Sequence, residues 1–244
     1  MKIACDPEVF LFDGKQIVSA IGKLGTKKCG DVAVEEDNVL AEFQIEPTTY
    51  RGTFVERVGK GIQAIKDVSG MDIRIQSSHT FTKEYLKSLS PKAFVFGCST
   101  DRNAYTEAVN PKPNPYTNLR CGGGHLHIDV HKKRREQRVM IVKLLDLYLG
   151  VPSVLLDSDR DRRRLYGKAG AYRPKQYGLE YRTLSNFWLR SDKLIGWVFD
   201  QTEKALETST YVNCIPYAQV RRCIDTSDRG LAQKLIHRQG IQMP

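Results

Sequence analysis

Alternating hydrophobic and polar positions predict several short β-strands along the chain. The first run, Ile3 to Phe12, leads into Asp13-Gly14, a strong turn signal, and a second run follows at 16–20. This is the pattern of a β-hairpin. Further strands are predicted at 40–46, 72–76, 125–131 and 178–183. Because successive strand side chains face opposite sides of a sheet, each alternating run gives one polar and one apolar face.

Apolar residues at helical spacing predict four helices, at 52–68, 133–149, 191–207 and about 228–238. Thr53 is the candidate N-cap of the first helix, and Ser191-Asp192 starts the third. Gly150 and Pro152 are the expected end of the second helix. Residues 88–119 contain several prolines and are predicted to form a long loop. The sequence thus predicts an α+β fold, a mainly antiparallel sheet flanked by helices, in a single domain over 1–244.

Two of the predicted strands carry acidic side chains on one face. On the first strand, Asp6 and Glu8 are two positions apart. On the strand at 40–46, Glu42, Gln44 and Glu46 follow one another at the same spacing. Carboxylates that share a face repel one another unless a cation or a proton lies between them. The alternative is an exposed polar edge, which Pro7 would suit. Two acidic faces within 50 residues favour a cation site.

The run from Arg120 to His131 places four polar side chains on one strand face: His125, His127, Asp129 and His131. The spacing His-x-His is a recurrent arrangement of metal ligands on strands. Three glycines directly before it allow the backbone to approach a ligand closely. A half-exposed strand with no ligand is the alternative, but four polar groups in register favour metal binding.

A loop rich in Gly, Lys and Arg leads into the strand at 178–183. Glu180 and Arg182 share one face of that strand, next to the loop residues Lys168 and Arg173. A carboxylate binds divalent metals through oxygen, and an arginine holds a phosphate or carboxylate with two parallel hydrogen bonds. The pattern suggests handling of a phosphorylated species. The alternative is an Arg–Glu pair on a solvated sheet face.

Composition narrows the class of protein. The 244 residues carry a formal net charge of +10, which favours anionic partners such as nucleotides, nucleic acid or acidic peptides. No run approaches the roughly 18 apolar residues of a membrane helix, and the acidic start of the chain does not resemble a secretory signal. The six cysteines lack Cys-x-x-Cys spacing, which indicates free thiols in a reducing cytoplasm.

Together these segments resemble the glutamine synthetase and glutamate–cysteine ligase superfamily. More closely they resemble the phage-type carboxylate–amine ligases, also called COOH–NH2 ligase type 2 amidoligases. The resemblance extends over roughly 3–190. It rests on Asp-Pro-Glu-Val-Phe-Leu-Phe-Asp, Asp37-Asn-Val-Leu-Ala-Glu-Phe, Gly-Gly-Gly-His-Leu-His, Arg164-x-Tyr-Gly-x-Ala-Gly-x-x-Arg173 and Gly178-x-Glu-Tyr-Arg-Thr-Leu-Ser-Asn-Phe-Trp.

The resemblance implies a glutamine-synthetase-like catalytic domain that uses ATP and Mg²⁺, or Mn²⁺ because a histidine is among the ligands. It implies an amide bond formed through an acyl phosphate, on a small molecule or peptide that supplies the carboxylate and the amine. One metal would be held by Asp6, His125 and Glu180, and a second by Glu8, Glu42 and Glu46. Arg182 and Arg173 would act in catalysis with Glu180, and ATP would contact Arg164, Lys168, Arg173 and His127. Asp6 departs from the family, which has glutamate there.

Two other classes fit the same residues. A metal-dependent hydrolase or nuclease could use these acids and histidines, and it would act without ATP. A basic nucleic-acid-binding module would bind DNA in a strongly salt-dependent manner. The arginine-rich loop joined to Gly-x-Glu-x-Arg favours phosphoryl chemistry over both.

Overall fold

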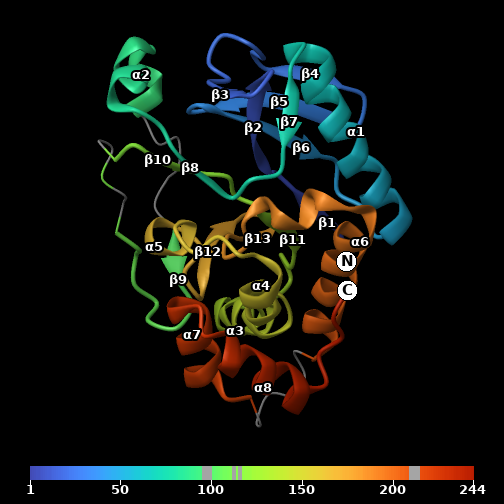
Figure 1. The fold of residues 1–244 in the computed structure, drawn as a ribbon. Helices are drawn as coiled ribbons and strands as arrows, with labels where there is room; N and C mark the ends of the chain where they lie inside the picture. Colours follow the sequence, from blue (N-terminus) through green and yellow to red (C-terminus); the bar gives the residue numbers. More distant parts are fainter. Residues whose placement is uncertain (95–100, 112–113, 115–116, 209–214) are drawn as a thin grey trace.

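The computed structural model describes residues 1–94, 101–111, 114, 117–208 and 215–244, with the side chain of residue 164 excepted. Figure 1 shows two layers of β-structure with helices packed on their outer sides. The strands are β1 (Ile3–Cys5), β2 (Glu8–Asp13), β3 (Gln16–Val18), β4 (Lys27–Cys29), β5 (Val32–Asp37), β6 (Leu40–Ile45), β7 (Asp72–Arg74), β8 (Ser78–Thr80), β9 (Arg102–Asn103), β10 (Leu119–Cys121), β11 (Leu126–Asp129), β12 (Ala171–Lys175) and β13 (Gly178–Tyr181). The helices are α1 (Arg51–Ser69), α2 (Lys83–Ser88), α3 (Arg135–Leu145), α4 (Val151–Leu156), α5 (Arg162–Leu165), α6 (Asp192–Thr208), α7 (Tyr217–Thr226) and α8 (Arg229–Gln239), with short 3₁₀ or π segments η1 (Pro91–Phe94), η2 (Asp146–Gly150) and η3 (Asn186–Arg190).

Two antiparallel sheets organise the fold. The first has the strand order β1-β11-β13-β12-β9, and the second has the order β3-β2-β6-β5-β4 with β7 pairing to β2. The described strand pairs of both sheets are antiparallel. The predicted α+β class with a mainly antiparallel sheet is therefore confirmed.

The sequence pattern predicted one continuous strand from Ile3 to Phe12, but the N-terminal run forms two strands. It divides at Asp6-Pro7, where β1 pairs with β11 in the first sheet and β2 pairs with β6 in the second. Proline has no N–H for a ladder hydrogen bond, which suits a break at this point. The hairpin turn itself is confirmed, with Gly14 in the left-handed region at φ 58° between β2 and β3. Because of the break, Asp6 and Glu8 are attached to different sheets.

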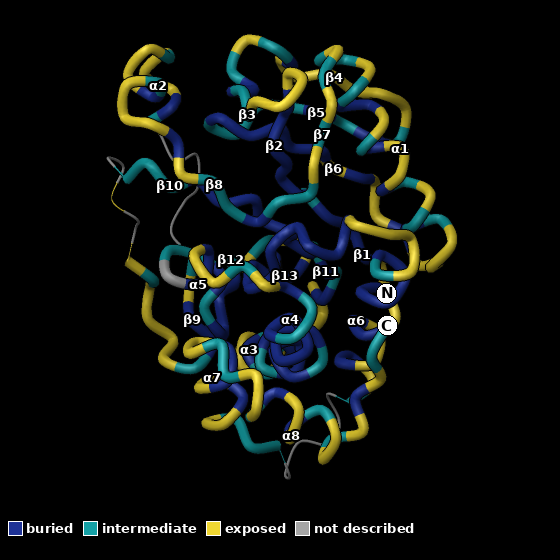
Figure 2. The backbone as a smooth tube through the Cα atoms, in the orientation of Figure 1, coloured by how far each residue is buried: buried dark blue, intermediate teal, exposed yellow. Residues whose placement is uncertain are grey.

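The helices bury their apolar faces against the two sheets and each other. Figure 2 shows the buried backbone concentrated in the sheets and in α3, α4 and α6. Helix α1 packs against β6 closely enough that a Cβ at Gly61 would lie 2.1 Å from the Phe43 ring. Small-residue contact of this kind lets a helix approach a sheet at core density.

Helix boundaries differ from the sequence expectation at two places, and helices α2 and α5 were not predicted. Helix α1 begins at Arg51, so the predicted cap Thr53 lies inside it. The predicted stop at Gly150 and Pro152 is wrong: α3 continues through the π-helical segment η2 into α4, and Pro152 lies directly after that π-helical segment. Helix α7 was not predicted. The expected start of α6 is confirmed, with the Leu194 N–H donating to the Ser191 hydroxyl.

The continuous helical segment Arg135–Leu156 is long and apolar enough to cross a membrane by length and composition. However, 72% of its apolar window is buried inside the protein. That burial is typical of the core helix of a globular protein rather than of a lipid-facing one. The cysteines that the structure describes, Cys5, Cys29, Cys121 and Cys223, are free thiols, as the sequence indicated.

Candidate metal and phosphoryl-transfer site

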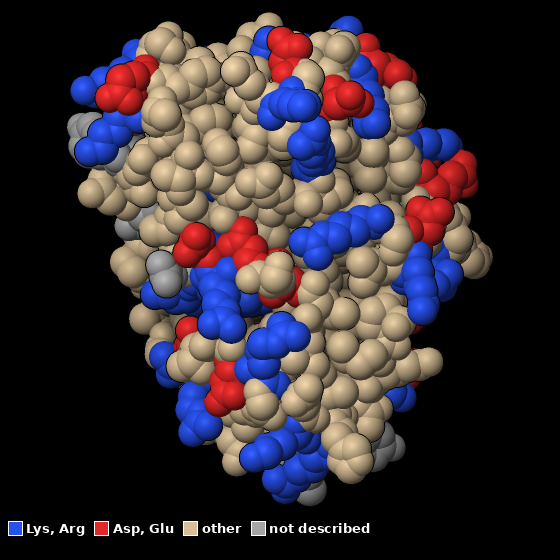
Figure 3. Space-filling view, in the orientation of Figure 1, with Lys and Arg blue, Asp and Glu red and all other residues tan. Residues whose placement is uncertain are grey.

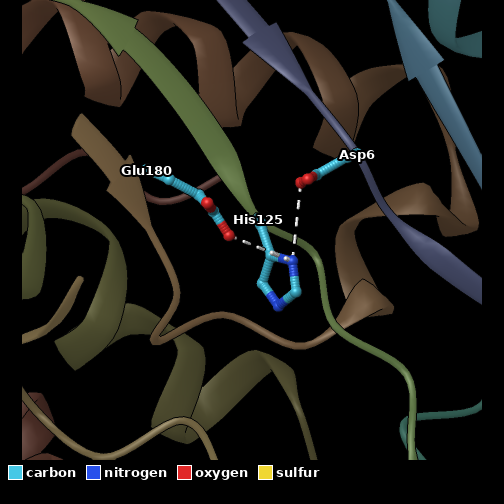
Figure 4. Close-up of side chains that lie close together, drawn as sticks. All are labelled: Asp6, His125 and Glu180. Atoms are coloured by element: carbon cyan, nitrogen blue, oxygen red, sulfur yellow. Dashed lines mark ion pairs between the residues drawn. The ribbon is translucent and has the colours of Figure 1, made fainter. Parts of the chain in front are cut away.

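Three side chains converge at the first sheet: Asp6 directly after β1, His125 directly before β11, and Glu180 on β13. We call them the Asp6 group. Figure 4 shows the three side chains pointing toward one another. His125 Nδ1 lies 3.4 Å from Asp6 Oδ1 and 3.9 Å from Glu180 Oε1. The group forms because β11 lies between β1 and β13, which places the histidine strand between the two acids.

Three cationic side chains surround Glu180, which is fully buried. Arg173 Nη1 donates to Glu180 Oε2 at 3.1 Å, Lys175 Nζ lies 3.0 Å from the same oxygen, and Arg182 donates to Oε1. Arg173 and Lys175 come from β12, whose register puts Arg173 directly opposite Glu180. The predicted Glu180–Arg182 pair is therefore not on a solvated surface, and it is part of a larger cationic cluster.

Glu8, Asp37 and Glu42 form a second cluster on the other sheet, and we call it the Glu8 group. Their ligand atoms all lie within 4.8 Å of one another. Glu8 and Glu42 are directly opposite on β2 and β6, and Asp37 ends β5. Like charges directly opposite in a sheet destabilise it. His125 Nδ1 lies 4.0 Å from Glu8 Oε1, so the two groups are adjacent.

Burial and charge give the two groups opposite electrostatic characters. Burial raises the pKa of Glu8 to about 8, with Asp37 adding to it, and burial together with the neighbouring acids Asp6 and Glu8 raises the pKa of Glu42. In the Asp6 group, burial opposes ionisation, but His125 and His127 hold the pKa of Asp6 below its usual range. Burial likewise opposes ionisation of Glu180, but Arg182 lowers its pKa to about 2. The Glu8 group is thus a cluster of repelling carboxylates, whereas the Asp6 group is compensated.

The donor atoms fit divalent cations. The Glu8 group offers carboxylate oxygens, the ligands that Mg²⁺ prefers. The Asp6 group adds an imidazole nitrogen, which suits Mn²⁺ as well. Asp6 Oδ1 is buried and receives no hydrogen bond in the structure, so a carboxylate oxygen is left to be satisfied. A cation between the acids of the Glu8 group would remove their repulsion.

Neutralising one acid of the Glu8 group tests this directly. Because the pKa of Glu42 is raised in the folded protein, ionising this side chain lowers the free energy of unfolding. The protein is therefore expected to lose stability as the pH rises above the ordinary pKa of a glutamic acid. We expect Glu42→Gln at neutral pH without divalent metal to raise the melting temperature by about 2–4 °C, equivalent to on the order of 1 kcal/mol at this chain length. The same variant should lose most of the stabilisation that Mg²⁺ gives to the wild type.

Thermal denaturation with and without MgCl₂ measures both effects, and Glu84→Gln on the exposed face of α2 serves as the matched control. A Glu42→Gln protein that is less stable without metal and equally stabilised by Mg²⁺ would contradict the assignment of this cluster as a cation site.

Other predicted residues lie in different surroundings. Glu46 is not in the Glu8 group: its side chain is 54% exposed and pairs with Lys28. It follows Glu42 on the same face by alternation, but β6 has reached solvent there, as the exposed Gln44 already shows. His131 pairs with Asp129 outside the site. His127 does reach it, with Nε2 2.8 Å from Asp6 Oδ2.

Two further cationic residues, Lys168 and Arg164, were predicted to contact ATP. Lys168 is half-buried, and its carbonyl accepts a hydrogen bond from the Thr183 hydroxyl, which ties the glycine-rich loop to the segment that follows β13 and carries Arg182. Arg164 lies in α5, and its side chain falls outside the described residues.

Sequence reasoning missed two acids. Asp37 lies at the hairpin between β5 and β6, where strand alternation no longer predicts a direction. Its signals were the acidic run at 35–37 and its place at the start of the motif Asp37-Asn-Val-Leu-Ala-Glu-Phe, to which no role for Asp37 was attached. Asp146, in a helix to which the sequence assigned no chemistry, is fully buried. It accepts hydrogen bonds from the Gly170 N–H at 2.6 Å and from the hydroxyls of Tyr181 and Thr183 at 2.8 and 3.0 Å. It therefore fixes the residues on both sides of Arg182.

Two cavities flank the groups. One, which we call the Tyr177 cavity, has a volume of about 350 Å³ and contains Asp6, His127 and Tyr177 together with apolar side chains such as Ile45 and Pro47. The other, the Arg162 cavity, contains Glu8, Asp37 and His125 on its acidic side. Its other walls are formed by Arg120, Arg162, Arg182, Tyr166, Cys121, Asn38 and Leu40. The two groups thus lie between an amphipathic cavity and an arginine-rich one.

Comparison with known families supports the expectation from the sequence. Residues 112–213 match the family of phage phiEco32-like COOH–NH2 ligases, type 2. The match supports the expected ligase family over this segment. No curated protein matches the chain. The matched segment includes His125, His127, Arg173, Glu180 and Arg182, whereas the acids of the Glu8 group lie outside it and are joined to the ligase segment by the geometry alone.

Proposed function

We propose that the protein is an ATP- and Mg²⁺-dependent ligase that forms an amide bond between a carboxylate and an amine through an acyl phosphate. The observation that supports it best is the pair of adjacent groups, six ligand side chains with Arg173, Lys175 and Arg182 against them. Phosphorylating a carboxylate requires two anions to approach each other, and cations with arginine donors offset that repulsion. The family match supports the carboxylate–amine ligase class.

In this proposal, the divalent cations neutralise and polarise the transferred phosphoryl group. The residues of this chain hold and orient the reactants. Arg182 is fixed between Glu180 and Asp101, with its Nε 3.7 Å from Asp101 Oδ2, so its guanidinium needs no rearrangement to meet developing charge. Arg173 approaches Glu180 from the next strand and would contact the ATP phosphates.

The nucleotide would occupy the Tyr177 cavity. That cavity combines apolar side chains and a tyrosine ring, which suit a base, with His127, which the family resemblance assigns to ATP. Small-molecule sites in proteins commonly combine an apolar lining with a few polar groups in this way. The carboxylate and the amine, on an amino acid or a peptide, would react in the cytoplasm, as the free thiols suggest.

The decisive experiment incubates the purified protein with ATP, Mg²⁺ and pools of amino acids and peptides. We expect ADP release together with a product that is lighter by one water than the sum of its two parents, and both should disappear with EDTA. ADP release would show ATP-dependent chemistry, and the product mass would identify both substrates.

The competing proposal is a metal-dependent hydrolase or nuclease, which the same acids could serve. Lys and Arg side chains gather over α7 and α8 in Figure 3, and they include Arg222, Lys234 and Arg238 around a shallow cavity. Such a surface could attract nucleic acid. Metal-dependent cleavage of DNA or peptide without ATP, with no ADP formed in any pool, would favour the hydrolase and refute the ligase.

A further inference from the structure

A further cavity of the protein, which we call the Arg135 groove, is lined mainly by cationic side chains. It has a volume of about 660 Å³, and two residues of β12, Tyr172 and Pro174, form the remainder of its lining. The four cationic residues are Arg102, Lys133, Arg135 and Arg138. They come from β9, from the turn before α3 and from the start of α3, so three segments place positive charge around one hollow.

The groove lies on the opposite face of the first sheet from Glu180. Arg173 is directly opposite Glu180 in the strand register, and its guanidinium donates to the Glu180 carboxylate. Because side chains alternate along a strand, the two neighbours Tyr172 and Pro174 face the other side of the sheet, where they line the groove. A ligand in the groove is therefore separated by the sheet from the metal groups, and it would not be the reacting group itself.

The positive charge of the groove is only partly compensated. Within the residues that the structure describes, Arg135 is the one cation of the four that pairs with a carboxylate, that of Glu107, with Nη2 2.5 Å from Oε2. Lys132 and Arg134 add two charges next to the groove, at the N-terminal end of α3. The helix dipole is positive at that end, so cations there repel it as well as one another. An anion in the groove would relieve this repulsion.

Glu107 indicates which kind of anion the groove accepts. Its carboxylate lies against Arg135, and its backbone carbonyl accepts a hydrogen bond from Arg102 Nη1 at 3.4 Å. Glu107 adopts φ 57°, in the left-handed region that residues other than glycine enter at a cost. The side chains of Arg135 and Glu107 are 64% and 54% exposed, and an exposed ion pair of this kind opens easily in water. A carboxylate from another molecule can therefore take the place of Glu107.

The groove is joined to the proposed active site by one hairpin turn. Arg138 Nη1 donates to the carbonyls of Lys175 and Gly178 at 3.3 and 3.2 Å, on either side of the turn between β12 and β13. That turn carries Tyr177, which lines the Tyr177 cavity beside the Asp6 group. A chain that lies in the groove is thus held next to the hairpin end that leads to the metal groups.

We propose that the Arg135 groove binds an acidic segment of a peptide substrate, on the other side of the sheet from the groups that react. The description of the bound peptide as a substrate rests on the proposed ligase function. Arginine forks hold carboxylates with paired hydrogen bonds, and the volume of the groove is in the range that encloses small ligands. Single-stranded nucleic acid would need exposed rings on which its bases stack, but Tyr172, the aromatic residue of the lining, is 3% exposed.

A binding measurement without ATP tests the groove. Fluorescence anisotropy compares labelled hexaglutamate with labelled hexaglutamine, in EDTA so that bound metal does not contribute. We expect the wild type to bind hexaglutamate at least about 10-fold more tightly than hexaglutamine. The double variant Lys133→Gln/Arg135→Gln should weaken hexaglutamate binding roughly 10-fold. Glu107→Gln should strengthen it about threefold, because it removes the internal carboxylate, and a loss of folding cannot produce that gain.

Lys234→Gln/Arg238→Gln is the matched control, because it removes the same charge from the cavity of α7 and α8. Its affinity for hexaglutamate should stay within about twofold of the wild type. Equal weakening in the two double variants, or no preference for hexaglutamate in the wild type, would overturn the proposal. Labelled hexathymidylate that binds more tightly than hexaglutamate, and is lost in Lys133→Gln/Arg135→Gln, would replace it with a nucleic-acid site.

Kinetics with an acidic peptide that reacts in the ADP assay test the substrate role. In Lys133→Gln/Arg135→Gln we expect the KM for this peptide to rise roughly 10-fold with kcat unchanged, because the groove lies across the sheet from the reacting groups. An unchanged KM would refute the substrate role. Hexaglutamate binding in a protein that releases no ADP would support the groove and refute the ligase, whereas ADP release by a protein that does not bind hexaglutamate would refute the groove alone.

Discussion

Replacing Glu180 by Gln is expected to reduce turnover about 1000-fold or more, equivalent to about 4 kcal/mol of transition-state stabilisation. Glu180 is the point where the proposed cation ligands meet the cationic side chains Arg173, Lys175 and Arg182. A neutral amide cannot hold a divalent cation as a carboxylate does, and it leaves these three cations facing one another. Steady-state ADP release and product formation measure the loss.

Because Glu180 is buried and paired, Glu180→Gln should also lower the melting temperature, while the protein stays folded. Circular dichroism at the assay temperature therefore accompanies the kinetics, and Glu84→Gln, an exposed glutamate exchange, is the control. Turnover near the wild-type rate in a folded Glu180→Gln protein would remove Glu180 from the mechanism.

Arg182→Lys is expected to lower kcat roughly 100-fold, equivalent to about 2.7 kcal/mol. Arg182 is 5% exposed and its guanidinium reaches Glu180, Asp101 and the Nδ1 of His125 together. A lysine ammonium is a point charge that cannot occupy this fork-shaped position, although it keeps the net charge. The effect should therefore fall on kcat more than on the KM for ATP.

Arg190→Lys gives the matched comparison, since Arg190 is 39% exposed and lies 3.9 Å from Asp157 outside the site. We expect it to keep wild-type kinetics. If Arg182→Lys behaved in the same way, positive charge alone would suffice at this position, and a bidentate role for Arg182 would be wrong.

Strand alternation predicted a large part of the candidate site, and its failures have a physical cause. It indicated Asp6, Glu8, Glu42, His125 and Glu180, all of which the structure brings together. It also indicated Glu46, which follows on the same face but beyond the point where that face is buried. Alternation reports which face a side chain is on, and it carries no information on how far along the strand that face stays buried.

Residues outside regular strands were less predictable. Asp37 reaches the Glu8 group from a hairpin end that includes Asn38 at φ 57°, and Arg162 belongs to an arginine-rich run that looks in sequence like a solvated surface. Its burial depends on tertiary contacts with the carbonyls of Thr183 and Arg182, about 20 residues away in the chain. The helix end predicted at Gly150 and Pro152 was wrong for the same reason. Packing of α4 in the core, rather than local helix propensity, determines that the helix continues.

The division of the N-terminal run between two sheets has a consequence for synthesis on the ribosome. The Glu8 group draws its acids from positions 8, 37 and 42, so its sheet can close early. Strand β1, which precedes it, is bridged to the early residue Thr48, but it has to wait for β11 to emerge before it finds its sheet partner. Until then the nascent chain carries a trio of repelling carboxylates beside an unpaired strand, a form that exposes an edge to other chains. Mg²⁺ bound to the early acids, as proposed for this cluster, would shorten the life of that form, so metal supply would influence the yield of folded protein as well as its turnover.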